Sequence, residues 1–66
     1  MSETIRALTH VQREIEKLVQ AQGEHIVSGR PDSFEDYRHI CGVILGLNYA
    51  NNILNDLVQK METSDD

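Results

Sequence analysis

The sequence is poor in the residues that stabilise most small domains. Its 66 residues include one cysteine, one proline, no tryptophan and three aromatic residues in total. A single cysteine cannot form an internal disulfide, and a chain this short is too small for a self-contained catalytic cleft. Domains of this size usually need a disulfide, a metal or a partner chain for comfortable stability. These absences predict one small domain that depends on a partner.

Basic residues and long apolar runs are also scarce. Six Lys and Arg stand against eleven Asp and Glu, which gives a net charge of -5. Because nucleic-acid binding relies on basic residues that neutralise phosphates, we expect no direct nucleic-acid binding. The longest apolar stretch, 40–47, is broken by Gly42 and Gly46 and is far shorter than the roughly 20 residues that span a bilayer. The start of the sequence lacks the basic and apolar segments of a signal peptide. We therefore expect no membrane partner, and the lone thiol fits a reducing compartment.

The first half of the sequence has the apolar spacing of one helix face. Its apolar residues are Ile5, Leu8, Val11, Ile15, Leu18, Val19 and Ile26, mostly at steps of three and four. Ser2 suits the N-cap position before this stretch. Gly23 costs about 1 kcal/mol relative to Ala inside a helix, so we expect a kink or fraying there. The pattern predicts a helix over about 3–27.

The segment 28–33 carries the signals that end one helix and begin another. Gly29 suits the left-handed position after a helix C-terminus. Pro31 disfavours helical geometry in the residue before it. Either Asp32 or Ser33 can cap the next helix, because each has an acidic residue three positions later. A connection this short returns the chain antiparallel to the first helix.

The second half carries a sustained heptad-type repeat. Its members are Tyr37, Ile40, Ile44, Leu47, Asn51, Leu54, Val58 and Met61, at alternating steps of three and four. This spacing is typical of a helix that packs along another helix. Asn51 is the one polar member, and a buried Asn in such a row often sets register at a cost in stability. The sequence thus predicts a helix over about 34–61, an acidic tail at 62–66, and an all-α antiparallel two-helix hairpin.

The second predicted helix has more apolar surface than one neighbouring helix can cover. Outside the heptad row lies a second set of apolar or small residues: Gly42, Leu45, Gly46, Tyr49, Ala50, Ile53 and Leu57. A helix that is apolar nearly all round is a buried helix. We therefore expect this second set to contact copies of the same chain or a larger protein, with the glycines allowing close approach. The alternative is that the first helix crosses at Gly42 and Gly46, and the row from Tyr37 to Val58 faces the partner.

Residues that could support catalysis or metal binding are few and dispersed. Zinc needs three or four convergent ligands, whereas His10, His25 and His39 are far apart in the sequence. Cys41 borders the heptad row, where a free cysteine behaves as a small buried apolar residue. His39 is close to Cys41 in sequence but lies on a different side of a helix. We therefore expect no enzymatic activity, no metal, no cofactor and no small-molecule substrate.

One sequence pattern in the second half has known counterparts. The segment 34–50 places a Tyr after the turn, then Gly42, then Gly46 followed by Leu47, then Ala50. The segment 56–61 and acidic residues follow. In these features the chain resembles small helical-hairpin proteins encoded by tailed bacteriophages, particularly short-tailed phages. The resemblance covers about the second half of the chain.

The resemblance implies a structural or accessory role in the phage particle. The implied contacts are with the chain itself or with a larger virion protein, at the capsid or at the head–tail connector formed by portal and tail. The implied location is the virion or the host cytoplasm. A function of a different class stays open, namely a small acidic phage regulator that binds and inhibits a host or phage protein.

Overall fold

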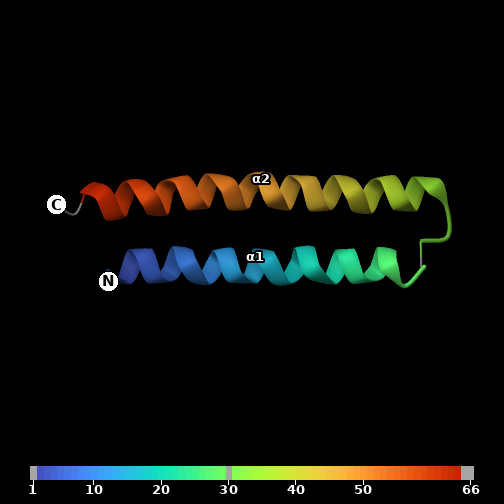
Figure 1. Ribbon diagram of the computed structural model, residues 1–66, viewed down its shortest axis with the longest axis horizontal. Helices are drawn as coiled ribbons and strands as arrows, with labels where there is room; N and C mark the ends of the chain where they lie inside the picture. The colour runs from blue at the N-terminus through green and yellow to red at the C-terminus, as the bar shows by residue number, and fades with distance from the viewer. Residues whose placement is uncertain (1, 30, 65–66) are drawn as a thin grey trace.

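The chain folds as an all-α antiparallel hairpin of two long helices. The computed structural model describes residues 2–29 and 31–64. Helix α1 spans Glu3–Val27 and helix α2 spans Phe34–Ser64, and no strand occurs among the described residues. The two helices lie side by side along a rod of 51 × 14 × 12 Å, with the start of α1 and the end of α2 at the same end of the rod (Figure 1). The predicted fold class is confirmed.

Helix α1 begins at the residue that its sequence indicates. The Ser2 backbone is extended, and its Oγ accepts a hydrogen bond from the backbone N–H of Ile5 at 3.0 Å. Glu3 in the first turn is favourable next to the positive end of the helix dipole. The helix continues through Gly23 to Val27, so the expected fraying does not occur. The half-buried Ile26 follows Gly23 by one turn and keeps the last turn of α1 against α2.

Local hydrogen bonds end α1 and begin α2 on either side of the connection between the helices. The backbone N–H of Ser28 donates to the carbonyl of Glu24 at 2.9 Å, and that of Gly29 donates to the carbonyl of Ile26 at 3.1 Å. Gly29 has a φ of 75°, the left-handed conformation that glycine adopts without steric cost. At the start of α2 the Ser33 hydroxyl accepts from the N–H of Asp36 at 3.1 Å. Ser33 is therefore the residue that caps α2.

Helix α2 is longer than the sequence predicts. It extends to Ser64, so residues 62–64 are helical rather than part of a tail. The Thr63 hydroxyl donates to the carbonyl of Gln59 at 2.8 Å, one turn back. No glycine or proline interrupts this stretch, and the residues around Glu62 tolerate helical geometry. The predicted tail at 65–66 lies outside the described residues.

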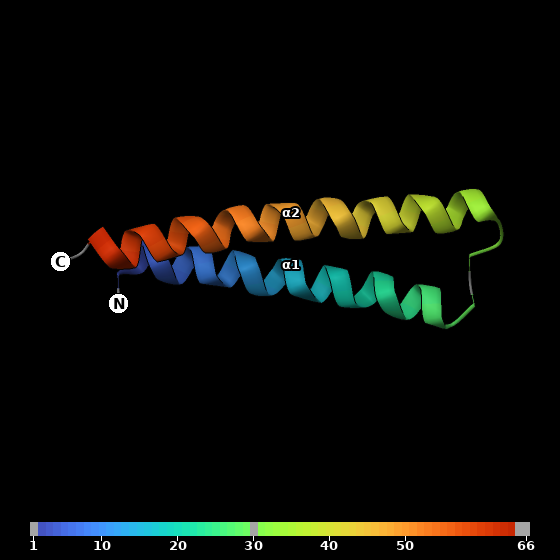
Figure 2. The ribbon, with the colours of Figure 1, turned by 45° about the horizontal axis from the view of Figure 1, so that its top comes forward.

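Burial follows one heptad row on each helix, and we call these two rows the seam. The row on α1 comprises Ile5, Leu8, Gln12, Ile15, Val19, Gln22 and Ile26, and that on α2 comprises Ile40, Ile44, Leu47, Asn51, Leu54, Val58 and Met61; all are buried or half-buried. The most buried are Ile5, Ile40 and Val58, at 3, 7 and 7% exposed. They lie near the two ends of the rod. Alternating steps of three and four keep both rows in contact along the length of the pair, and Figure 2 shows the helices crossing at a shallow angle.

The seam differs from the predicted rows at two places. Tyr37 is 44% exposed and lies outside the seam, because α1 has already ended at Val27 and offers no turn opposite it. Its ring stacks instead on Phe34, with ring centroids 6.4 Å apart. On α1, Val11 and Leu18 were expected on the buried stripe but are exposed.

Candidate interaction surface

One side of the hairpin presents apolar side chains from both helices. In an antiparallel helix pair, each side of the seam is bordered by one row of residues from each helix. On this side the flanking row of α1 begins at Thr4 and ends at His25. Between these two it holds Val11 and Leu18, while the flanking row of α2 holds Val43, Ala50 and Leu57, with Ile53 in the next row of α2. We call the six apolar residues of these rows, from Val11 and Leu18 on α1 to Ile53 and Leu57 on α2, the apolar face. None of them carries a charge.

Most of the apolar face is open to solvent. Leu18 is 53% exposed and Ile53 is 68% exposed, while Val11 and Leu57 are each 43% exposed. Val43 and Ala50 are half-buried beside the seam. Singly scattered apolar side chains are normal on protein surfaces, but a contiguous apolar patch marks an interaction site. The six residues of the apolar face lie on the same side of both helices, and this side is therefore the candidate functional site of this chain.

The opposite flank of the seam is polar, and we call it the polar edge. Its positions hold Thr9 and Glu16 on α1, and Cys41, Asn48 and Asn55 on α2. The hydroxyl of Thr9 donates to the carbonyl of Ile5 at 2.8 Å, so this side chain is satisfied within its own helix. The hairpin therefore has two sides of different character. The sequence-based expectation that α2 is apolar nearly all round was too broad, because the polar edge runs along it.

The predicted interface residues of α2 lie on three sides of the helix. Ala50, Ile53 and Leu57 belong to the apolar face. Gly46 lies in the same row as Ile53, one heptad nearer the turn, and so borders the apolar face.

The remaining predicted residues lie farther from the apolar face. Gly42 and Tyr49 occupy the back of α2, directly opposite the seam, and both are exposed. Leu45 is 54% exposed and lies toward the polar edge. The structure therefore does not bring all seven predicted interface residues onto one surface.

The glycines of α2 take no part in the contact with α1. A Cβ atom built on Gly42 or Gly46 would meet nothing within 4 Å. The seam that faces α1 is instead the heptad row of α2. The alternative in which α1 crosses α2 at these glycines is therefore wrong. The space in front of Gly46 is therefore unoccupied, and it lies beside the apolar face.

Val11 and Leu18 were missed as candidate interface residues by the sequence analysis. Their signal lies in the register of α1, where a strict heptad row from Ile5 requires Gln12 and Gln22 in the seam. If the buried side of α1 is chosen by hydrophobicity alone, it includes Val11 and Leu18 and excludes these glutamines. In the structure the glutamines are half-buried, and Val11 and Leu18 lie on the flank of the seam.

The histidines and the cysteine do not assemble a chemical site. His25 and His39 line one open depression beside the turn, together with Asp32 and Asp36, whereas His10 lies farther along α1. Within the described part of the chain no group of three or more His, Cys, Asp or Glu residues could hold a metal ion.

Cys41 is exposed, which corrects the expectation that it is buried. It lies on the polar edge, beside the seam rather than in it. A hydrogen bond with the Cys41 thiol raises the pKa of Tyr37 above its ordinary value. The phenol therefore stays protonated to a higher pH than an isolated tyrosine.

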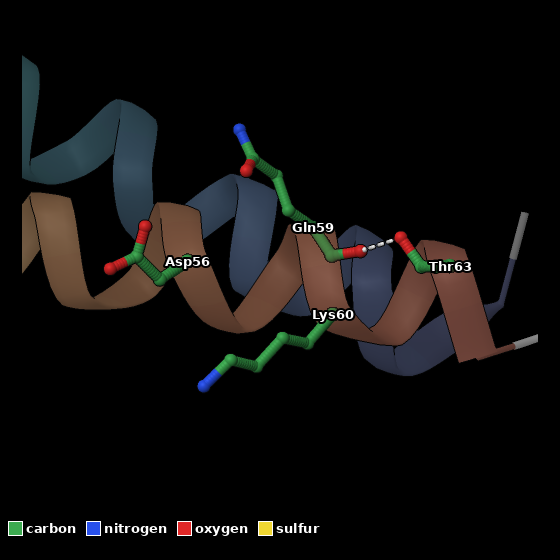
Figure 3. Close-up of a pocket in the computed structure, with 4 residues that line it drawn as sticks. All are labelled: Asp56, Gln59, Lys60 and Thr63. Carbon is green, nitrogen blue, oxygen red and sulfur yellow. Dashed lines mark hydrogen bonds between the residues drawn. The ribbon is translucent and has the colours of Figure 1, made fainter.

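An open depression near the end of α2 also offers no convergent chemistry. Its lining residues are Asp56, Gln59, Lys60 and Thr63, all from the same helix. Figure 3 shows Gln59 and Lys60 extending in opposite directions from the helix, and its one dashed line joins Thr63 to the Gln59 carbonyl. Side chains that fan outward from one helix do not surround a ligand, and ligand sites are generally concave.

One surface ion pair lies beside the apolar face. The Lys17 Nζ and a Glu14 carboxylate oxygen are 2.9 Å apart, one helical turn from each other on α1. The hydrogen bond from Lys17 and its positive charge lower the pKa of Glu14 below its ordinary value. Both side chains are largely exposed, so this pair contributes little to the stability of the fold.

Comparisons with protein families, curated proteins and solved structures found no match for this chain. Neither helix, over its described residues, has an apolar stretch long enough to cross a membrane.

Proposed function

We propose that this chain is a non-enzymatic structural or adaptor protein of a bacteriophage particle, and that it acts through protein contact at the apolar face. The observation that carries the proposal is the exposure of Leu18 and Ile53 on one uncharged surface built by both helices. Such a surface favours burial against another protein, since each large apolar side chain that is fully buried contributes roughly 1.5–3 kcal/mol. The resemblance of segment 34–50 to phage helical-hairpin proteins supports the particle as the setting.

Purified phage particles provide the test. Particles made from the genome that encodes this chain are separated on a density gradient, and their proteins are quantified by mass spectrometry. We expect the chain at a constant copy number per particle or per assembly intermediate, and fewer complete particles when its gene is deleted. Absence of the chain from particles and intermediates, with normal particle yield after deletion, would overturn the proposal.

The second candidate is a small acidic regulator that binds and inhibits one host or phage protein. The net charge of -5 favours this candidate, because an acidic surface suits a basic target. The same experiment separates the two functions. A regulator would be absent from purified particles, and cross-linking in infected cells would join it to one non-virion protein.

A further inference from the structure

We propose that the apolar face is the interface of a homodimer in which two hairpins pack face to face as a four-helix bundle. This inference rests on the proposed function, since it names the first partner of the apolar face as a second copy of the same chain. It adds a defined surface and a defined stoichiometry. Three features of the hairpin carry it.

The first feature is the width of the apolar pattern. A helix that meets only one partner needs apolar residues in the two seam positions of each heptad, whereas a helix inside a bundle adds one flanking position. Both helices add the same flank, through Val11 and Leu18 on α1 and through Val43, Ala50 and Leu57 on α2. The other flank is polar on both helices. This pattern is typical of a bundle with a second layer on one side.

The second feature is the amount of exposed surface. The hairpin exposes 5241 Å². A monomeric globular protein of its mass, 7.5 kDa, exposes about 4,200 Å², so the hairpin has an excess on the order of 1,000 Å². A stable interface of standard size buries roughly 800 Å² on each partner. Burial of one interface of this size would therefore reduce the exposed area of each chain nearly to that of a compact protein of the same mass.

The third feature is the match between the face and a second hairpin. The face is two helices wide and lies along one side of the 51 Å rod. A second hairpin presents a layer of the same width and length. In a two-fold dimer each patch meets its own copy, and an uncharged patch does so without electrostatic repulsion; all six face residues are uncharged. The open space beside Gly46 lets the neighbouring helix approach closely.

The test compares three matched substitutions in the full chain. Ile53→Glu and Leu18→Glu place a charge on the apolar face, one on each helix. Leu45→Glu places the same charge on α2 at a residue of similar exposure, 54%, but toward the polar edge. Mass is measured by light scattering and sedimentation over a concentration series, and helicity by circular dichroism.

The wild-type chain is expected to be a dimer. Ile53→Glu and Leu18→Glu are each expected to raise its dissociation constant at least about 100-fold, because each charge is introduced twice per symmetric interface. Leu45→Glu is expected to leave the dimer unchanged. A second measurement needs no variant, since the thermal midpoint of a dimer rises with protein concentration.

Several outcomes would contradict the dimer. A wild-type chain that stays monomeric and helical, with a midpoint independent of concentration, overturns it while leaving the proposed function to be judged by the particle experiment. A dimer that Leu18→Glu and Ile53→Glu leave intact shows that another surface is used. Disruption by Leu45→Glu to the same degree, or a stable species larger than a dimer, excludes the face-to-face pair.

Discussion

The Ser2 hydroxyl accepts a hydrogen bond from the backbone N–H of Ile5, whose side chain is the most buried in the described part of the chain at 3% exposed. One residue therefore both caps α1 and positions the first side chain of the seam. The open end of a hairpin has no loop to hold it together. At this end the cap and Ile5 keep the first turn of α1 against α2.

Removal of this cap is expected to destabilise the hairpin. Ser2→Ala leaves the Ile5 N–H without its acceptor and costs about 1 kcal/mol, which lowers the thermal midpoint by about 4–8 °C in a domain of this size. Circular dichroism melting measures the change. Thr9→Ala is the control, because the Thr9 hydroxyl bonds to a carbonyl inside the same helix and the midpoint should change little. Equal losses from both substitutions would contradict a special role for the cap.

Replacement of Asn51 is expected to stabilise the hairpin. Its Oδ1 is buried in the seam without a hydrogen-bond partner, and a buried unsatisfied polar atom costs about 1–3 kcal/mol. Asn51→Leu should raise the denaturant midpoint of unfolding, whereas the same change at the exposed Asn52 should have little effect. A lower midpoint for Asn51→Leu would mean that the amide maintains the register of the two helices, as polar seam residues do in coiled coils.

Two glycines are expected to respond with opposite signs to the same substitution. Gly29 has a φ of 75°, so Gly29→Ala strains the turn by about 1 kcal/mol. Gly23 lies inside α1 with nothing within 4 Å of an added Cβ, so Gly23→Ala should stabilise the helix by about 0.5–1 kcal/mol. Urea unfolding of the two variants under identical conditions measures both effects. A stabilising Gly29→Ala would show that the turn changes its conformation.

The ion pair between Glu14 and Lys17 is expected to be visible in the titration of Glu14. Lys17 lowers the pKa of Glu14 in the folded state, so the contribution of the pair to stability is present above the unfolded pKa. That contribution is lost as the pH falls through the lowered folded value. Carboxyl resonances followed by NMR should show a higher Glu14 pKa in Lys17→Ala.

Arg13→Ala is the matched control for this titration, because it removes a nearby positive charge and leaves Lys17 in place. It should leave the Glu14 titration close to that of the wild-type chain. Added salt should also reduce the effect of Lys17, since both side chains are exposed to solvent. A Glu14 titration that is identical in the wild type and Lys17→Ala would show that the pair does not form in solution.

Much of the fold was predictable because its signals are local. Ser2 and Ser33 are good N-cap residues and both cap their helices, while Gly29 supplies the left-handed residue that ends α1. The extent of α2 was less predictable. Acidic residues oppose the dipole at a helix C-terminus and suggested an earlier end, but the stretch before Ser64 contains no residue that breaks a helix.

The candidate surface was only partly predictable, because burial depends on the neighbouring helix. Ile53 and Leu57 were identified from the sequence of α2 alone, as apolar residues that one neighbouring helix cannot cover. Leu18 was assigned to the buried stripe, since hydrophobicity does not distinguish a seam position from its flank. Gln12 and Gln22 occupy the seam because a strict heptad row keeps contact with α2 along the whole pair.

The amino-acid sequence by itself determined two helices, their caps and a turn that makes them antiparallel, because these depend on backbone preferences and on hydrogen bonds between near neighbours. The tertiary structure decided how each helix is rotated about its axis. That rotation places Gln12 and Asn51 in the seam, and Leu18 and Ile53 in solvent. The periodicity of one helix is compatible with several rotations, and only packing against the other helix selects among them.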